Sequence, residues 1–137
     1  MNEAIELHDS VVTSVSPSGR SVVLTLRPAY VHCSEGCPGV DVGTGSYHGA
    51  TLTISNGSIS ECVSLPNTIS EGSLWVEGVF HDNVIPAAGE YEGPIELRLV
   101  FQTAETFNAR ADGILIALDD VASACMQESF KPRAVDL

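Results

Sequence analysis

Residues 94–103 read Pro-Ile-Glu-Leu-Arg-Leu-Val-Phe-Gln-Thr. Apolar and polar side chains alternate in this stretch, which places Ile95, Leu97, Leu99 and Phe101 on one face. A period of two is the pattern of a β-strand that buries one face and exposes the other. The stretch therefore predicts a strand that contributes four large side chains to a β core.

Shorter stretches with the same period, or rich in β-branched residues, recur along the chain. They predict further strands at residues 10–16, 21–31, 50–55, 58–65, 73–80, 106–111 and 114–118. Asn56-Gly57 and Asp112-Gly113 are each expected to form a two-residue type I′ turn, because both central residues of that turn need a positive φ.

The remaining stretches predict a bend, a loop and a helix. Pro28 removes a backbone donor, so the strand that contains it should end, bend or lie at an edge there. The Gly-rich residues 36–49 are expected to form a loop. A short helix is expected over about residues 121–130, with Asp119 or Asp120 as its N-terminal cap. No shift in composition marks a domain boundary, so residues 1–137 are expected to form one all-β domain. That domain would have about eight antiparallel strands, as a sandwich or partly open barrel, and one short C-terminal helix.

The chain is strongly acidic, with 18 Asp or Glu against 6 Lys or Arg and a formal net charge of -12. It lacks the clustered cations that bind nucleic acid or anionic lipid, so neither partner is expected. The N-terminus has neither the basic nor the apolar region of a signal peptide. No stretch approaches the about 18 apolar residues that a membrane span needs. We therefore expect a soluble, cytoplasmic protein.

In that compartment the four cysteines are expected to be free thiols. Cys62 and Cys125 lie in apolar patterns and should be small buried side chains. In an oxidising compartment four cysteines would allow three pairings, of which Cys33–Cys37 is favoured.

Two His-Asp pairs are the candidate binding residues. His8, Asp9 and Ser10 are three residue types used in catalysis, but neighbours on an extended chain alternate faces and cannot form a hydrolase relay among themselves. A local role is favoured, in which Asp9 and Ser10 bond nearby backbone groups. His81 and Asp82 end another predicted strand, where loops carry function. If the two pairs met in space, they would form a candidate metal or acid–base site.

A second set of metal-ligating residue types is His32, Cys33, Cys37 and His48. Thiolate and imidazole are zinc ligands, but the spacing contains no second paired unit, so an incidental set in a loop is favoured. The chain also lacks the common phosphate-loop, dinucleotide, zinc-protease and serine-hydrolase motifs. We therefore predict no catalytic residue, no cofactor and no resident metal. The aromatic residues Trp75, Tyr30, Tyr47 and Tyr91 are assigned to core packing.

The two ends of the chain resemble a group of small bacterial proteins. Leu7-His8-Asp9-Ser10 leads into residues 11–15, a Gly-containing turn and residues 22–26, and residues 107–130 close the chain with two strands and a short tail. This arrangement is similar to bacterial proteins in which a His-Asp-Ser motif precedes the first hairpin. Most of them are domains of unknown function, and some are encoded as immunity proteins beside toxins. The resemblance implies an immunity-like role.

Two functions follow as expectations. The favoured one is a non-catalytic binding or interaction module, immunity-like, whose acidic surface attracts a basic protein partner. The alternative is a small β-barrel enzyme or metal-binding protein that uses the His/Asp or the Cys/His residues above. The sequence does not decide whether the protein is a monomer or a homodimer.

Overall fold

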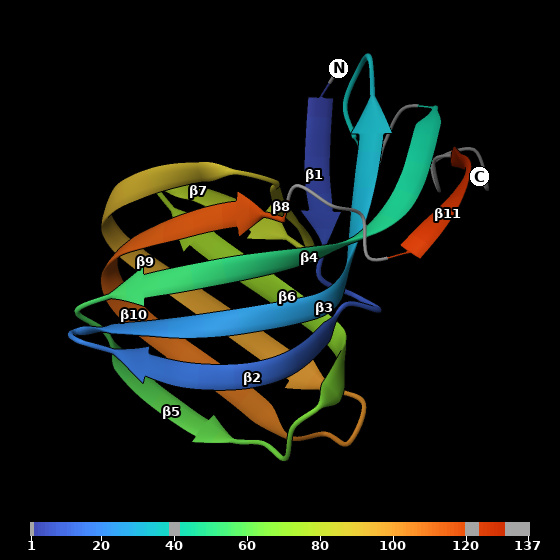
Figure 1. The fold of residues 1–137 in the computed structure, drawn as a ribbon. Coiled ribbons are helices and arrows are strands. Elements are labelled where there is room, and N and C mark those ends of the chain that lie inside the picture. The colour runs from blue at the N-terminus through green and yellow to red at the C-terminus, as the bar shows by residue number, and fades with distance from the viewer. Residues whose placement is uncertain (1, 39–41, 120–123, 131–137) are drawn as a thin grey trace.

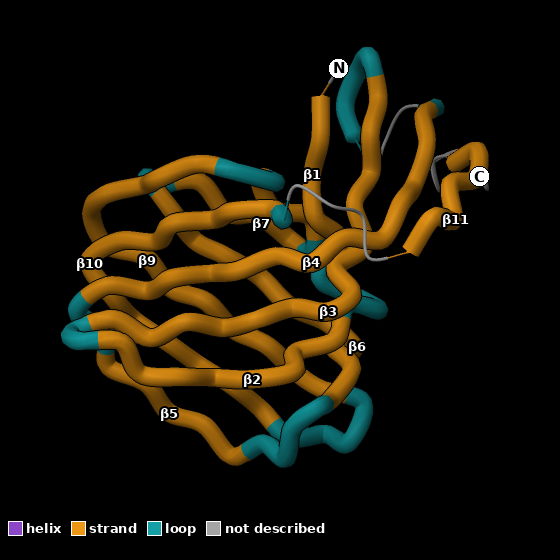
Figure 2. Tube along the Cα trace, viewed as in Figure 1, coloured by secondary structure: helices purple, strands orange, loops and turns teal. Residues whose placement is uncertain are grey.

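The computed structural model describes residues 2–38, 42–119 and 124–130, and over these residues the chain consists of strands and loops (Figure 2). The strands are β1 (Asn2–Glu6), β2 (Val11–Ser18), β3 (Ser21–Ser34), β4 (Gly43–Ser55), β5 (Ser58–Cys62), β6 (Asn67–Val76), β7 (Val79–Asp82), β8 (Val84–Pro86), β9 (Gly89–Phe101), β10 (Thr106–Leu118) and β11 (Ala124–Phe130). In this part of the chain no helix is long and apolar enough to cross a lipid bilayer.

Six strands close into a barrel, in the order β3-β4-β10-β9-β6-β2 and back to β3 (Figure 1). All these neighbours are antiparallel. The shortest strand pairing of the barrel is that of β2 with β6, where only Val11 and Val12 pair with Thr68 and Asn67. We call this pairing the β2–β6 seam. The sheet is thus a closed barrel rather than the sandwich or partly open barrel that the strand spacing suggested.

The barrel is filled by side chains from alternate positions of its strands, as a small barrel requires. The four large residues of the opening stretch, Ile95, Leu97, Leu99 and Phe101, are at most 3% exposed. Their burial confirms the strand and the face predicted from its period of two. Other strands add Leu24, Leu26, Leu52, Ile54, Ile69, Leu74, Phe107, Ile114 and Ile116 to the same core.

Two long strands continue beyond the barrel and form an extension of the same sheet. A register irregularity between Leu26 and Ala29 bends β3 at Pro28, so of the three outcomes expected there (an end, a bend or an edge) the strand takes the bend. Beyond it, the outer halves of β3 and β4 join β1, β8 and β11 in the order β8-β1-β3-β4-β11. Figure 1 shows the outer parts of β1, β3 and β4 standing away from the barrel. We use the name arm for β1, β8, β11 and the outer halves of β3 and β4.

Neither predicted type I′ turn exists. Residues 50–55 and 58–62 run one after the other along β10, so β5 does not return on β4. Asn56 has φ 52°, but Gly57 has no positive φ, and the dipeptide makes a kink rather than a reversal. Residues 106–118 form the single strand β10, which continues through Asp112-Gly113 with a register irregularity between Ala111 and Gly113. A Cβ on Gly113 would lie 3.0 Å from the Tyr91 carbonyl oxygen, so this glycine permits close approach of β9 rather than a turn.

A hairpin occurs instead inside the stretch predicted as one strand at residues 73–80. β6 and β7 pair through Val76 and Val79 around the two-residue turn Glu77-Gly78. Both turn residues have positive φ, 51° and 74°, as a type I′ turn needs. Since Glu rarely adopts this conformation, the dipeptide carries a weak sequence signal.

Three further expectations need correction. The predicted loop over residues 36–49 is partly strand, because β4 begins at Gly43 and pairs with β3. Cys62 is exposed rather than buried, because it ends the surface strand β5. The C-terminal helix is not confirmed: Ala124–Phe130 is extended and pairs with β4, while residues 120–123 lie outside the described residues. The side chain of Cys125 lies outside them as well.

Candidate functional site

The first candidate site lies where the chain passes from the arm into the barrel. Backbone bonds fix each residue of this connection: Leu7 N donates to Asn83 O at 2.7 Å, Asp9 N to Ile69 O at 3.0 Å and Ser10 N to Leu7 O at 3.0 Å. His8 N donates to the Asn83 side-chain oxygen at 2.8 Å. The side chains carried by this segment therefore stand on a rigid backbone, which is the condition for a preorganised site.

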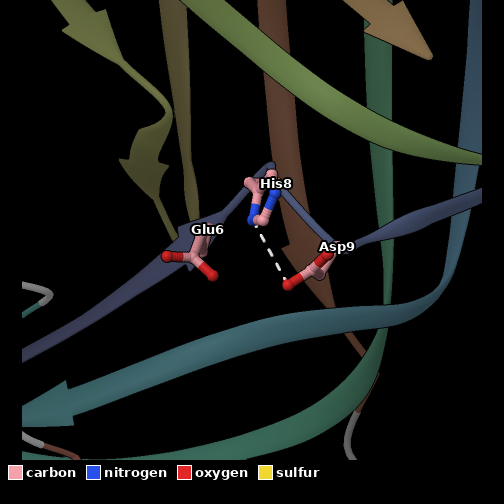
Figure 3. Close-up of side chains that lie close together, drawn as sticks. All are labelled: Glu6, His8 and Asp9. Carbon is pink, nitrogen blue, oxygen red and sulfur yellow. Dashed lines mark ion pairs between the residues drawn. The ribbon is translucent and has the colours of Figure 1, made fainter. Parts of the chain in front are cut away.

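Three of these side chains converge. His8 Nδ1 lies 3.2 Å from an Asp9 carboxylate oxygen. With Glu6 they form a group in which one ligand atom from each residue lies within 4.8 Å of the other two. Figure 3 shows the three side chains on the same side of the chain, with the two carboxylates flanking the imidazole. Among the residues that the structure describes, no other group of three His, Cys, Asp or Glu comes this close.

The conformation of Asp9 explains how adjacent residues meet. Asp9 has φ 73°, in the left-handed region that Asp tolerates better than most residues. The extended alternation expected from the sequence is broken there, and the Asp9 carboxylate turns back to His8. No local sequence pattern predicts this backbone conformation at Asp9.

Glu6 is the member of the group that sequence reasoning missed. It ends β1, opposite Tyr30 of β3. The buried imidazole of His32 lies next to it, with Nε2 3.5 Å from a Glu6 carboxylate oxygen. The alternation Glu6-Leu7-His8 could have identified Glu6 as a neighbour of His8. It places these two residues on the same side of an extended chain, with the buried Leu7 between them.

Ser10 has a structural role. Its side chain is fully buried, and its hydroxyl donates to the Glu6 carbonyl oxygen at 2.6 Å while accepting from Tyr30 N at 3.1 Å. The hydroxyl ties the start of β2 to β1 and β3. A serine held in this way is not placed to act as a nucleophile, which agrees with the local backbone bonding expected for it.

His81 and Asp82 do not join the Glu6, His8 and Asp9 group. They lie on β7 and pair with Leu74 and Ser73 of β6. Paired residues of an antiparallel sheet share a face. His81 is therefore on the side of the buried Leu74, and Asp82 is on the outer side. The predicted pair is split between the two faces of the sheet.

The Cys/His set does not form a group in the described part of the chain either. His32 contacts Glu6, while His48 Nε2 lies 2.8 Å from the Ser46 hydroxyl. Cys33 is a free, partly exposed thiol, so it forms no disulfide with Cys37. Burial, aided by the Glu3 carboxylate, raises the pKa of the Cys33 thiol above its ordinary value. A raised thiol pKa disfavours the thiolate that zinc needs.

This pKa shift predicts slow alkylation of Cys33. Since the raised pKa keeps the thiol protonated at neutral pH, iodoacetamide should modify Cys33 more slowly than the exposed free thiol of Cys62. A time course followed by peptide mass spectrometry measures both rates. Glu3→Gln removes the carboxylate 3.6 Å from the Cys33 sulfur and should speed its reaction while leaving Cys62 unchanged. Equal rates at the two thiols in the wild-type protein would contradict this account.

A second candidate site, which sequence reasoning did not identify, covers the outer wall of the barrel. Trp75 of β6 and Phe80 of β7 are cross-strand partners, with ring centroids 6.1 Å apart. They are 47% and 56% exposed, so the assignment of Trp75 to core packing was wrong. Tyr91, by contrast, packs against the core as expected. The pairing of Trp75 with Phe80 depends on the unrecognised hairpin at Glu77-Gly78.

Three adjoining hollows run from this aromatic pair across β9 and β10. One of about 320 Å³ is lined by Trp75, Phe80 and Glu96, and one of about 440 Å³ by Phe80, Glu71 and Asp82. The third, of about 310 Å³, extends to β5. Arg98 lines all three. We call this outer surface around Trp75, Phe80 and Arg98 the Trp75–Phe80 face; it includes Asp82, one of the predicted binding residues.

The comparisons with known proteins add no relative to this description. No family model matches the sequence, and no curated protein or solved structure matches the chain significantly.

Proposed function

We propose that this protein is a non-catalytic binding module that holds a basic protein partner on its Trp75–Phe80 face. The observation that carries the proposal is the exposed aromatic pair beside the hollows lined by Arg98. Adjacent exposed apolar side chains mark interaction sites more often than single ones do, and aromatic residues are enriched at the centres of protein interfaces. They offer a wide contact area and lose little conformational entropy on binding.

The charges around the pair favour a basic partner. Glu71 and Asp82 line the same hollow as Phe80, and the chain as a whole has a formal net charge of -12. Arg98 and Arg110 share Glu96, whose carboxylate oxygens lie 3.6 Å and 3.2 Å from their Nε atoms. With Glu71 and Asp82, the face therefore has three acidic side chains against two arginines. A Lys or Arg of the partner can lie over an aromatic ring and reach the Glu71 or Asp82 carboxylate. The overall negative charge would also speed encounter with a basic protein.

The immunity-like role is the specific form of this proposal that the resemblance of the chain ends implies. In that role the partner would be a basic toxin, and the acidic protein would be expected in the cytoplasm as a monomer or homodimer. The burial and bonding of Ser10 support a non-catalytic function, because they leave the His8-Asp9-Ser10 segment without an available hydroxyl nucleophile.

The proposal predicts that an oligo-arginine peptide changes the fluorescence of Trp75. The chain contains a single Trp, so its emission reports on this face alone. We expect a saturable change whose apparent affinity falls as salt is added, because exposed charges are screened. Phe80→Ala should weaken the binding by about 10-fold or more, as for a truncated central aromatic residue. Asp82→Asn should weaken it at low salt only.

Matched controls separate this face from the rest of the acidic surface. Leu115→Ala removes another exposed apolar side chain, 41% exposed on β10 beside Glu90, Glu92 and Asp112, and should leave the titration unchanged. An oligo-glutamine peptide should produce no change. Equal losses in Phe80→Ala and Leu115→Ala, or an affinity that salt does not alter, would contradict the proposal. An emission that depends on protein concentration without peptide would instead assign the face to a second copy of the chain.

A further inference from the structure

We propose that Glu6, His8 and Asp9 form a binding site for a divalent transition-metal ion, with zinc as the best fit, and that the buried His32 orients Glu6 in it. The site is distinct from the Trp75–Phe80 face and does not depend on the partner proposed there. Its ligands would be two carboxylates and one imidazole, all of which zinc accepts.

The distances suit a small ion. Zinc lies about 2.0–2.2 Å from nitrogen and oxygen ligands, so neighbouring ligands of a tetrahedral site are about 3.3–3.6 Å apart. His8 Nδ1 and the Asp9 oxygen already lie 3.2 Å apart, and all three ligand atoms lie within 4.8 Å of one another. Small rotations of the Glu6 side chain would close the remaining distance. Three protein ligands leave a fourth position for water, as in zinc sites that are open to solvent.

The charges of the group also favour a cation. Two carboxylates lie close together here, and neither forms an ion pair with a Lys or Arg among the described residues. Like charges at this separation repel unless a positive charge lies between them. A divalent ion would supply that charge. The side chains of Glu6, His8 and Asp9 are 20%, 38% and 55% exposed, so an ion can reach them.

The surroundings of the group resemble the outer ligand shell of a metal site. Ligands in such sites are usually held by second residues that fix their orientation. The His32 side chain is 2% exposed, and its Nε2 faces the Glu6 carboxylate at 3.5 Å. The Tyr30 ring packs edge-on against the His32 ring, with centroids 4.8 Å apart. These contacts restrict the orientation of Glu6, while backbone hydrogen bonds fix the segment from Leu7 to Ser10 that carries His8 and Asp9.

Calorimetric titration of tag-free, metal-stripped protein with zinc chloride at neutral pH tests the proposal. We expect one zinc ion to bind per chain, and we expect His8→Ala to weaken the binding by more than ~10-fold. His81→Ala is the matched control, because His81 is partly buried on β7 and lies outside the group. It should bind zinc as the wild type does. His32→Gln removes a buried ring that packs on Tyr30, so it should lower the unfolding midpoint of the metal-free protein. Under conditions in which the variant is folded, it should give an intermediate loss of zinc binding through the orientation of Glu6.

The cysteines require a separate readout. Cobalt in place of zinc gives a thiolate charge-transfer band only when sulfur is a ligand. The proposal expects cobalt to bind without that band. No stoichiometric zinc binding by the wild-type protein would overturn the proposal. So would binding that His8→Ala leaves unchanged, or a thiolate band, which would place the ion on cysteine.

Discussion

Phe107→Ala should lower the free energy of unfolding by about 3–5 kcal/mol, the usual loss for truncating a fully buried aromatic side chain. Phe107 is fully buried on β10 and belongs to the barrel core. It pairs with Leu99 of β9 on one side and Glu61 of β5 on the other. Hydrogen bonds around a closed ring of strands oppose a collapse of the walls into the cavity. We therefore expect a loss near the upper end of that range.

Urea unfolding followed by circular dichroism measures this loss, with the slope of the transition unchanged if the native state keeps its compactness. Leu115→Ala is the matched control, because Leu115 is on the same strand but 41% exposed. Its free energy of unfolding should stay within about 0.5 kcal/mol of the wild type. A loss below about 1 kcal/mol for Phe107→Ala would mean that the barrel interior is not packed as described.

Ser10→Ala should have the second largest effect. The hydroxyl bridges the Glu6 carbonyl oxygen and the Tyr30 backbone nitrogen in a fully buried position. Removal of the hydroxyl takes one hydrogen bond from each of these groups, and a buried polar group left unsatisfied costs about 1–3 kcal/mol. Because Ser10 stands beside the short β2–β6 seam, the loss should also loosen the junction of barrel and arm.

Two measurements separate this local effect from general destabilisation. Hydrogen exchange of the Tyr30 amide should speed up more than exchange in the middle of β9, since only the former loses a direct partner. Ser16→Ala changes an exposed serine of the same strand and should alter the free energy of unfolding by at most about 0.5 kcal/mol. Unaltered stability in Ser10→Ala would show that the hydroxyl does not hold the junction.

Local sequence patterns predicted most of the strands and which of their faces are buried. The alternation in residues 94–103, and that of Leu24 with Leu26, was sufficient because the side-chain period of a strand depends only on the chain itself. Strand partners depend on distant residues. The run from β4 into β5 lies along β10 as a whole, and no local feature at Asn56-Gly57 distinguishes that kink from a hairpin turn.

The candidate sites were only partly predictable for the same reason. His8 and Asp9 were identified by residue type, but their contact depends on the left-handed Asp9, which the sequence does not specify. Trp75 and Phe80 became neighbours through a turn at Glu77-Gly78 that lacks the usual Asn or Asp. Asp82 lies on the same outer face as Trp75 and Phe80. His81 lies on the opposite face of the sheet, because adjacent strand residues alternate between faces.

The measurement that tests the central claim most directly is a map of backbone amide shifts by nuclear magnetic resonance during titration with the oligo-arginine peptide. The proposed function predicts that the shifts gather on β6, β7 and β9, with the Trp75 indole signal among the largest. Shifts that gather instead around Glu90, Glu92 and Asp112, or spread evenly over the acidic surface, would contradict the assignment of the Trp75–Phe80 face as the docking surface.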